Sequence, residues 1–169
     1  GNATDQALMR FLGEDNYNLI KSDATYIAGM SQGFNSTNKF SQVEIKDLGQ
    51  TFYKGAPEKF MEVANKALDI DGNVVDLDYN ALDEKINLLA TKAMRVLAFG
   101  YSNKALTENK INDDVVLIGL VAIRDDVRPE AKEAIAEVQN AGIQVVMITG
   151  DRLETAVAIA EDAGLIKSE

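Results

Sequence analysis

The sequence contains no cysteine and no histidine among its 169 residues. Without cysteine the chain has neither a disulfide framework nor a thiolate metal site. Without histidine it lacks the usual general base and the usual zinc ligand. Many enzyme classes are excluded by these two absences, and any catalytic or binding role must rest on lysine, arginine, carboxylate, hydroxyl and backbone groups.

Long apolar runs and excess positive charge are absent too. No segment approaches the roughly 20 apolar residues that cross a bilayer, so we expect no part of this chain to enter a membrane. The opening Gly1-Asn2-Ala3-Thr4 does not resemble a signal peptide. A formal net charge of -10 argues against nucleic acid as a partner. Since 46% of the residues are hydrophobic, the chain is predicted to be globular, with any phosphate-bearing ligand held in a local cationic pocket.

Hydrophobic spacing divides the first 125 residues into helices and strands, whereas residues 13–31 remain ambiguous. The elements predicted are a helix over residues 4–12, a hairpin with strands near 40–46 and 51–54, a helix from Pro57 to about 67, a tight turn at Asp71-Gly72, a helix over 79–92, and buried strands over 95–101 and 115–123.

The pattern changes at Arg124. Pro129 begins a helix that Gly142 ends, residues 143–148 form an apolar strand, and a further helix starts at Thr149-Gly150-Asp151. Helix, strand, polar turn and helix make the unit of a parallel doubly wound sheet. We therefore expect an α/β protein in which a mostly antiparallel sheet flanked by helices, residues 1–125, is followed by a Rossmann-like parallel segment, residues 126–169.

Several residues suit a purine nucleotide. Lys54 stands at a strand end before Gly55, which permits close backbone approach. Phe34 and Lys39 flank a polar loop, and Arg95 lies at a helix-to-strand junction. A ring for the base and cations for phosphates are what an acidic protein needs for such a ligand. Taken singly, each lysine is more often solvated surface, and a lone phenylalanine is more often core.

Two polar segments in the second part have alternative interpretations. Thr149, beside Gly150 and the amides of a helix start, can hold a phosphoryl oxygen, but Thr149 or Asp151 can equally serve only as a helix cap. Asp125 to Arg128 either positions a hinge or simply separates two elements.

Acidic residues also cluster near residue 70 and would suit a calcium site. The cluster consists of Asp69, Asp71, Asp76 and Asp78. It lacks the twelve-residue loop with a terminal bidentate glutamate, so it predicts a solvated hairpin and no metal site.

The order of the motifs resembles that of the P-type cation-transporting ATPases along essentially the whole chain. The matching segments are Gly1 to Leu8, Phe34 to Lys39, Lys54-Gly55-Ala56-Pro57-Glu58, Met94 to Ala98, Asp125 to Arg128, and Thr149-Gly150-Asp151. Lys54 to Glu58 is the most diagnostic of them, and its proline form is similar to the calcium-pump branch.

This resemblance implies a role for each matching residue. Asp5 would contact the nucleotide, Phe34 would stack on adenine, Lys39, Lys54 and Gly55 would line the pocket, and Arg95 would reach the phosphates. Asp125 and Arg128 match the hinge between the nucleotide-binding and phosphorylation domains. Thr149, Gly150 and Asp151 match the motif beside the phosphorylated aspartate. The second segment would then be part of a haloacid-dehalogenase-like fold.

Family members transfer the ATP γ-phosphate to an aspartate with Mg²⁺ and move a cation across a membrane, with the catalytic domains on its cytoplasmic face. The partners implied are therefore ATP and the actuator and transmembrane domains of a parent pump. The motif bearing the phosphorylated aspartate is not in this sequence, nor is the main magnesium motif. We therefore expect the chain alone not to turn over ATP.

The sequence also departs from the family pattern in places. Asp126-Val127 replaces the usual pair of hinge prolines, and Ser36 and Asn38 stand where arginines are common, so the hinge is expected to be less rigid and phosphate affinity weaker. Two other functions fit parts of the sequence. A haloacid-dehalogenase-type phosphatase would need an early Asp-x-Asp motif after an apolar strand, and a noncatalytic nucleotide-binding module would keep only the pocket.

Overall fold

The computed structural model describes residues 3–23, 27–92, 94–124, 127–151 and 153–166. The chain divides into two compact units, residues 1–79 with 97–121 and residues 80–96 with 122–169. Along the chain the elements are α1 (Ala3–Leu12), α2 (Glu14–Ser22), β1 (Ala28–Gln32), β2 (Phe40–Ile45), β3 (Gln50–Gly55), α3 (Pro57–Met61), β4 (Lys66–Leu68), β5 (Val74–Asp76), α4 (Tyr79–Ala90), β6 (Met94–Ser102), β7 (Val116–Arg124), α5 (Pro129–Asn140) and α6 (Leu153–Asp162).

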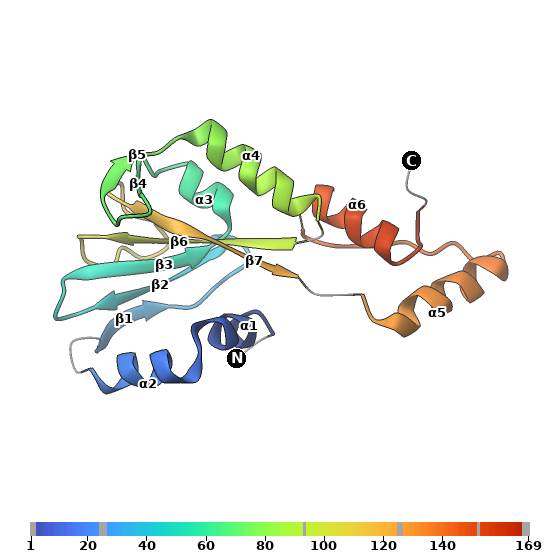
Figure 1. Ribbon diagram of the computed structural model, residues 1–169, viewed down its shortest axis with the longest axis horizontal. Coiled ribbons are helices and arrows are strands. Elements are labelled where there is room, and N and C mark those ends of the chain that lie inside the picture. Colours follow the sequence, from blue (N-terminus) through green and yellow to red (C-terminus); the bar gives the residue numbers. More distant parts are fainter. Residues whose placement is uncertain (1–2, 24–26, 93, 125–126, 152, 167–169) are drawn as a thin grey trace. The chain divides into compact units, whose positions relative to one another are not determined.

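The first unit is built on a seven-stranded sheet in the order β1-β2-β3-β6-β7-β4-β5 (Figure 1). Strands β1, β2, β3 and β6 pair antiparallel in succession, β4 pairs antiparallel with β5, and β4 pairs parallel with β7. The sheet is therefore mixed and mostly antiparallel, which confirms that expectation and the α/β class.

Helices cover both faces of this sheet (Figure 1). Helices α1 and α2 lie on one side and α3 lies on the other. Alternation along β3 follows this division, because Thr51, Tyr53 and Gly55 are buried while the residues between them are half-exposed. Phe60 of α3 is fully buried beside Gly100, so the side chains of Tyr53 and Phe60 belong to the core between the sheet and α3.

The β2–β3 hairpin is the best-specified part of the unit, and the structure confirms its prediction. Phe40 pairs with Gly55 and Ile45 with Gln50, so the strands run in register from end to end. Gly49 in the connecting turn has φ 59°, a left-handed value that glycine adopts without the steric cost of a Cβ.

The helix that begins at Pro57 is shorter than predicted. It ends at Met61, and residues 66–68 form strand β4 instead of continuing the helix to residue 67. Lys66 pairs with Asp76 of β5 and also with Val116 of β7. Two flanking strands satisfy the backbone of this segment, and those long-range pairings outweigh its local helical pattern.

The second unit contains most of α4, then α5 and α6, with the adjoining ends of β6 and β7. The helices agree with the predictions within a few residues, and Gly142 ends α5 with φ 76°. The predicted strand over residues 143–148 is wrong, since this segment belongs to no strand of the sheet. A strand requires a hydrogen-bonded neighbour, and no described strand pairs with it. Its apolar side chains are accordingly exposed, Ile148 by 93%.

The parallel Rossmann-like segment is therefore not confirmed.

Among the described residues, no helix is both long and apolar enough to cross a membrane.

Candidate functional site

Lys54 lies on β3 one residue before the buried Gly55, and its side chain is directed toward α1. The Lys54 Nζ donates a hydrogen bond of 2.5 Å to Asp5 Oδ1, an ion pair whose side chains remain 32% and 41% exposed. A partly exposed pair of this kind contributes at most about 1 kcal/mol to stability. Either charge can therefore exchange its partner for a ligand at small cost.

Lys39 ends the loop that begins with Phe34 and leads into β2. This loop is a tight turn, in which the Asn38 amide donates to Asn35 Oδ1 at 2.7 Å and the Lys39 amide donates to the Asn35 carbonyl at 2.8 Å. Lys39 has φ 59°, an uncommon conformation for a residue with a side chain. Its Nζ lies 3.5 Å from Glu58 Oε1 at the start of α3.

The backbones of Lys39 and Gly55 are held together. The Ala56 amide donates to the Lys39 carbonyl at 2.9 Å, one residue beyond the Phe40–Gly55 pair of the ladder. A Cβ at Gly55 would lie 2.5 Å from Phe40 Cβ and 2.7 Å from the Lys39 carbonyl oxygen, distances that real side chains do not tolerate. Glycine at this position thus allows β3 to approach β2 rather than a ligand, next to Lys54 on β3 and to Lys39, which immediately precedes β2.

Phe34 presents its ring to solvent, with 64% of the residue exposed. Within the described part of the chain this ring stacks on no other aromatic ring, whereas Phe40 and Phe52 each contact a tyrosine. The interpretation of Phe34 as core is therefore wrong. An exposed ring on a turn that also carries Lys39 is available to a flat ligand.

Arg95, Thr149, Gly150 and Asp151 belong to the second unit. Arg95 Nη2 lies 3.7 Å from Asp151 Oδ1. Thr149 Oγ1 donates to Asp151 Oδ2 at 3.0 Å and accepts from the Asp151 amide at 3.1 Å, so Thr149-Gly150-Asp151 is a self-bonded turn just before α6. That Arg95 joins Lys39 and Lys54 in one pocket stays a prediction.

The predicted hinge is only partly described. Arg128 is the N-cap of α5, with extended backbone and no side-chain capping bond, and Pro129 occupies the first helical turn. Asp125 lies outside the described residues.

The acidic cluster near residue 70 is a structured hairpin, as predicted. Asp69 Oδ1 accepts from the amides of Asp71 at 2.9 Å and Asn73 at 2.8 Å, and Gly72 has φ 82° in the turn between β4 and β5. These hydrogen bonds, first that from the Asn73 backbone, lower the pKa of Asp69. Asp76 is paired with Lys66 at 2.6 Å instead of facing Asp69.

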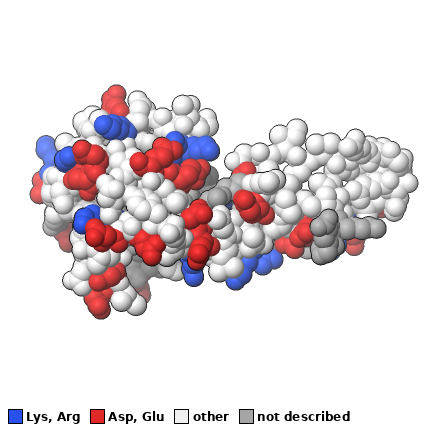
Figure 2. All heavy atoms as spheres, turned by 90° about the horizontal axis from the view of Figure 1, so that it is seen from above, with Lys and Arg blue, Asp and Glu red and all other residues white. Residues whose placement is uncertain are grey.

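Charges of both signs are interspersed on the face drawn in Figure 2. Figure 2 shows Asp and Glu side chains across this face with Lys and Arg between them, rather than a single basic patch. The three site lysine and arginine contacts described above all involve carboxylates, so positive charge is locally balanced within an acidic chain.

Sequence reasoning assigned no role to Glu58 or Asn35. The signal for Asn35 was present, because asparagine in a polar loop commonly bonds to a backbone amide a few residues on. Glu58 belongs to the Lys54 to Glu58 motif, but its pairing with Lys39 depends on the hairpin register.

Comparison with known proteins places these motifs in a family. The model of the family described as "P-type ATPase, cytoplasmic domain N" matches residues 1–130. Calcium-transporting ATPase 10, plasma membrane-type, from Oryza sativa subsp. japonica is 35% identical over 181 residues, which cover 100% of this chain and 18% of that protein.

Animal and bacterial relatives show similar agreement. Plasma membrane calcium-transporting ATPase 4 from Bos taurus is 31% identical over 182 residues, covering 98% of this chain and 15% of that protein. A calcium-transporting ATPase from Bacillus subtilis is 30% identical over 175 residues, covering 98% and 20%. The chain thus spans about a fifth or less of the length of these relatives. With the family model matching most of its length, this chain belongs to the cytoplasmic N-domain family of the P-type ATPases.

Proposed function

We propose that this chain is the ATP-binding part of a P-type ATPase that couples ATP hydrolysis to cation transport. The observation that supports the proposal is the β2–β3 hairpin, in which Lys54 lies on β3 and Lys39 immediately precedes β2, at the end of the turn that exposes Phe34. The arrangement offers a ring for adenine and ammonium groups for the phosphates. Family membership supports the same assignment.

The site residues divide into those that contact nucleotide and those that shape the pocket. Phe34 stacks on the base, and Lys39 and Lys54 bind phosphate or ribose oxygens. Asp5 holds the Lys54 ammonium group at 2.5 Å before nucleotide arrives and then contacts the nucleotide itself. Gly55 acts indirectly, because it permits the close strand approach that positions both lysines.

The second unit supplies the phosphate end of the reaction. Arg95 reaches the phosphates after leaving Asp151, and the Thr149-Gly150-Asp151 turn lies beside the phosphorylated aspartate of the parent protein. Asp125 and Arg128 form the hinge between a nucleotide-binding domain, residues 1–125, and part of a phosphorylation domain, residues 126–169. The apolar segment 143–148 packs against other parts of a haloacid-dehalogenase-like phosphorylation domain in the parent. Its exposure in this chain supports that assignment.

Magnesium neutralises the phosphate charge when it is bound with ATP. The family's main magnesium motif is not in this sequence, so we assign the magnesium ligands mainly to other parts of the parent. The phosphorylated aspartate is likewise assigned there, and the chain alone is expected to bind ATP without hydrolysing it.

Calcium is the proposed cargo of the parent pump. The proposal rests on the printed names of the relatives, which are calcium-transporting ATPases in plant, animal and bacterium. The ATP-binding part would work on the cytoplasmic face of the membrane, together with the actuator and transmembrane domains.

Titration of the chain with ATP, followed by amide chemical shifts, tests the proposal. A stacked ring and a few partly exposed cations predict a Kd between micromolar and millimolar. Lys54→Ala should weaken binding by about 5- to 30-fold through loss of one charge-assisted contact. Lys46→Ala is the matched control, since it removes one positive charge from an exposed turn of the same hairpin.

Either of two results would remove the proposed site. The first is an absence of shifts at Phe34 and Lys54 when ATP is added. The second is an equal ATP affinity in Lys54→Ala and Lys46→Ala, which would reduce the role of Lys54 to overall charge.

A further inference from the structure

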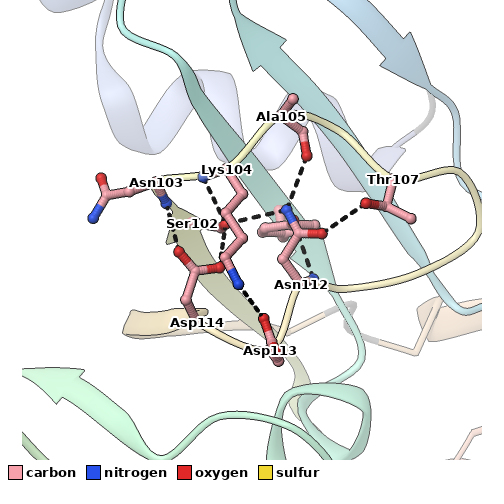
Figure 3. A network of polar contacts seen from close by, with 9 residues as sticks. Ser102, Asn103, Lys104, Ala105, Thr107, Asn112, Asp113 and Asp114 are labelled. Carbon is pink, nitrogen blue, oxygen red and sulfur yellow. Dashed lines mark hydrogen bonds and ion pairs between the residues drawn. The ribbon is translucent and has the colours of Figure 1, made fainter.

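Residues 103–115 connect β6 to β7 and are called here the β6–β7 loop. Side-chain hydrogen bonds join the two ends of this loop. Figure 3 shows the side chains that do this. Ser102 Oγ donates to Asp114 Oδ1 at 2.6 Å, and the Asn103 amide donates to Asp114 Oδ2 at 3.1 Å. Lys104 Nζ donates to Asp113 Oδ1 at 2.6 Å. The two ends of the loop are therefore clamped together.

Asn112 ties the interior of the loop to this base (Figure 3). It is only 6% exposed, and its Nδ2 donates to Ser102 Oγ at 3.1 Å and to the Ala105 carbonyl at 3.0 Å. Its Oδ1 accepts from Thr107 Oγ1 at 2.9 Å. Because a buried amide that loses its partners is costly, these bonds fix the path of the loop as far as Thr107.

The tip of the loop reaches two other segments. Asn109 Oδ1 accepts from Asn38 Nδ2 at 2.6 Å and also from the Gln32 Nε2. The Asn109 amide donates to Gln32 Oε1 at 2.9 Å. Asn38 belongs to the turn that carries Phe34 and Lys39, so a residue 71 positions away contacts the proposed nucleotide-binding turn directly.

These contacts are anchored by a buried side chain. Gln42 is 3% exposed, and its Nε2 donates to Gln32 Oε1 at 2.6 Å and to the Thr107 carbonyl at 2.8 Å. Gln32 and the loop are therefore both held by the same group within the sheet. Asn109 itself has φ 59°, a conformation that asparagine tolerates better than most residues.

We propose that Asn109 is a positioning residue for the nucleotide site, holding the Phe34 to Lys39 turn in its binding conformation before ATP arrives. This inference rests on the proposed function. The physical basis is preorganisation, because a turn that is already ordered loses less conformational entropy when the ligand binds. We assign Asn109 no contact with the nucleotide; it acts on the turn through its bond to Asn38, while its bonds to Gln32 hold Asn109 itself in place.

Asn109→Gly is the informative variant. Glycine keeps the left-handed backbone but removes the oxygen that Asn38 and Gln32 share. Loss of this acceptor should weaken ATP binding by about 3- to 10-fold. Asn109→Asp keeps an acceptor at the same place, and its Kd for ATP should stay within about twofold of that of the unsubstituted chain. Asn103→Ala is the control, since it removes a side-chain bond of the same loop, to Gln50 at 2.8 Å, away from the turn.

A double-mutant cycle with Asn38→Ala isolates the route. If Asn109 acts through Asn38, the double variant should bind ATP no more weakly than Asn109→Gly alone. Losses that multiply would show that Asn109 acts elsewhere and would overturn the inference. The inference would also be overturned if Asn109→Gly bound ATP as tightly as the unsubstituted chain, although the proposed ATP site would be unaffected by that result.

Hydrogen exchange without nucleotide tests the brace independently of ATP binding. The amides of Asn38 and Lys39 both donate to Asn35 within the turn, and their exchange should accelerate in Asn109→Gly but not in Asn103→Ala. Unchanged exchange would overturn the inference. If instead the unsubstituted chain failed to bind ATP while exchange accelerated in Asn109→Gly, the proposed function would be wrong, but the ordering of the turn by Asn109 would be confirmed.

Discussion

Gly55 offers the sharpest test of how the site is assembled. A Cβ at this position would lie 2.5 Å from Phe40 Cβ, 2.7 Å from Phe40 Cα and 2.7 Å from the Lys39 carbonyl oxygen. Carbon atoms in favourable contact lie about 3.5–4.0 Å apart, so Gly55→Ala is short of space by about 1 Å. Every obstructing atom is backbone or Cβ, and no rotamer change relieves the overlap.

The strands themselves would have to separate. We expect Gly55→Ala to lower the free energy of unfolding by about 3 kcal/mol, at the upper end of the usual cost of overpacking. With a urea slope of about 2 kcal/mol/M, the midpoint of unfolding would fall by about 1.5 M, measurable by circular dichroism. The Ala56–Lys39 hydrogen bond at 2.9 Å crosses the same point, so ATP binding should weaken together with stability.

Two other strand glycines provide a graded comparison. At Gly100 a new Cβ would lie 2.8 Å from Phe60 Cε1 and 3.0 Å from the Val116 carbonyl oxygen, a smaller overlap than at Gly55, so Gly100→Ala should cost less. Gly119 has nothing within 4 Å, and Gly119→Ala should be neutral or slightly stabilising. An unfolding midpoint for Gly55→Ala within about 0.3 M of Gly119→Ala would refute the reasoning.

Two further predictions concern titration. Burial raises the pKa of Tyr53 above 10.0, so the folded state retains this proton to a higher pH than the unfolded state does. The stabilisation from the neutral phenol is therefore complete below pH 10 and is lost as the pH rises through the folded pKa. In urea unfolding, the stability of Tyr53→Phe should accordingly fall less steeply at high pH than that of the unsubstituted chain. The hydrogen bond from Lys104 lowers the pKa of Asp113. In Lys104→Met, carbon-detected NMR should therefore show the pKa of Asp113 rising toward its ordinary value, with the pKa of Asp76 unchanged as the internal control.

Local sequence signals were sufficient where neighbouring residues determine the structure. Alternation and a glycine turn predicted the β2–β3 hairpin, and Pro129 with Gly142 predicted the limits of α5. They were insufficient for residues 66–68, whose strand character comes from β5 and β7 on either side. Residues 143–148 fail for the opposite reason: their apolar pattern is that of a buried strand, but no described neighbour pairs with them.

The same distinction applies to the site. Motifs indicated Asp5, Lys39 and Lys54, and the structure brings Asp5 to Lys54 across 49 positions of sequence. No sequence signal pointed to Asn109, because its partners lie 71 and 77 residues away and its neighbours form an ordinary polar loop. The sequence did not predict the positive φ angles of Lys39 and Asn109 either, since each conformation is imposed by the surrounding contacts.

The charge arrangement bears on the proposed binding of a polyanion by an acidic chain. Lys39 and Lys54 each face a carboxylate, at 3.5 Å and 2.5 Å, and both pairs are partly exposed. Such pairs are weak, so phosphate oxygens need only replace one acceptor by another at each ammonium group. In the proposed function, nucleotide binding is an exchange of anions at the two ammonium groups, and its net free energy is smaller than the same contacts would give to unpaired lysines. This exchange predicts the modest ATP affinity proposed above, while the placement of Lys39 and Lys54 depends on the close strand approach at Gly55.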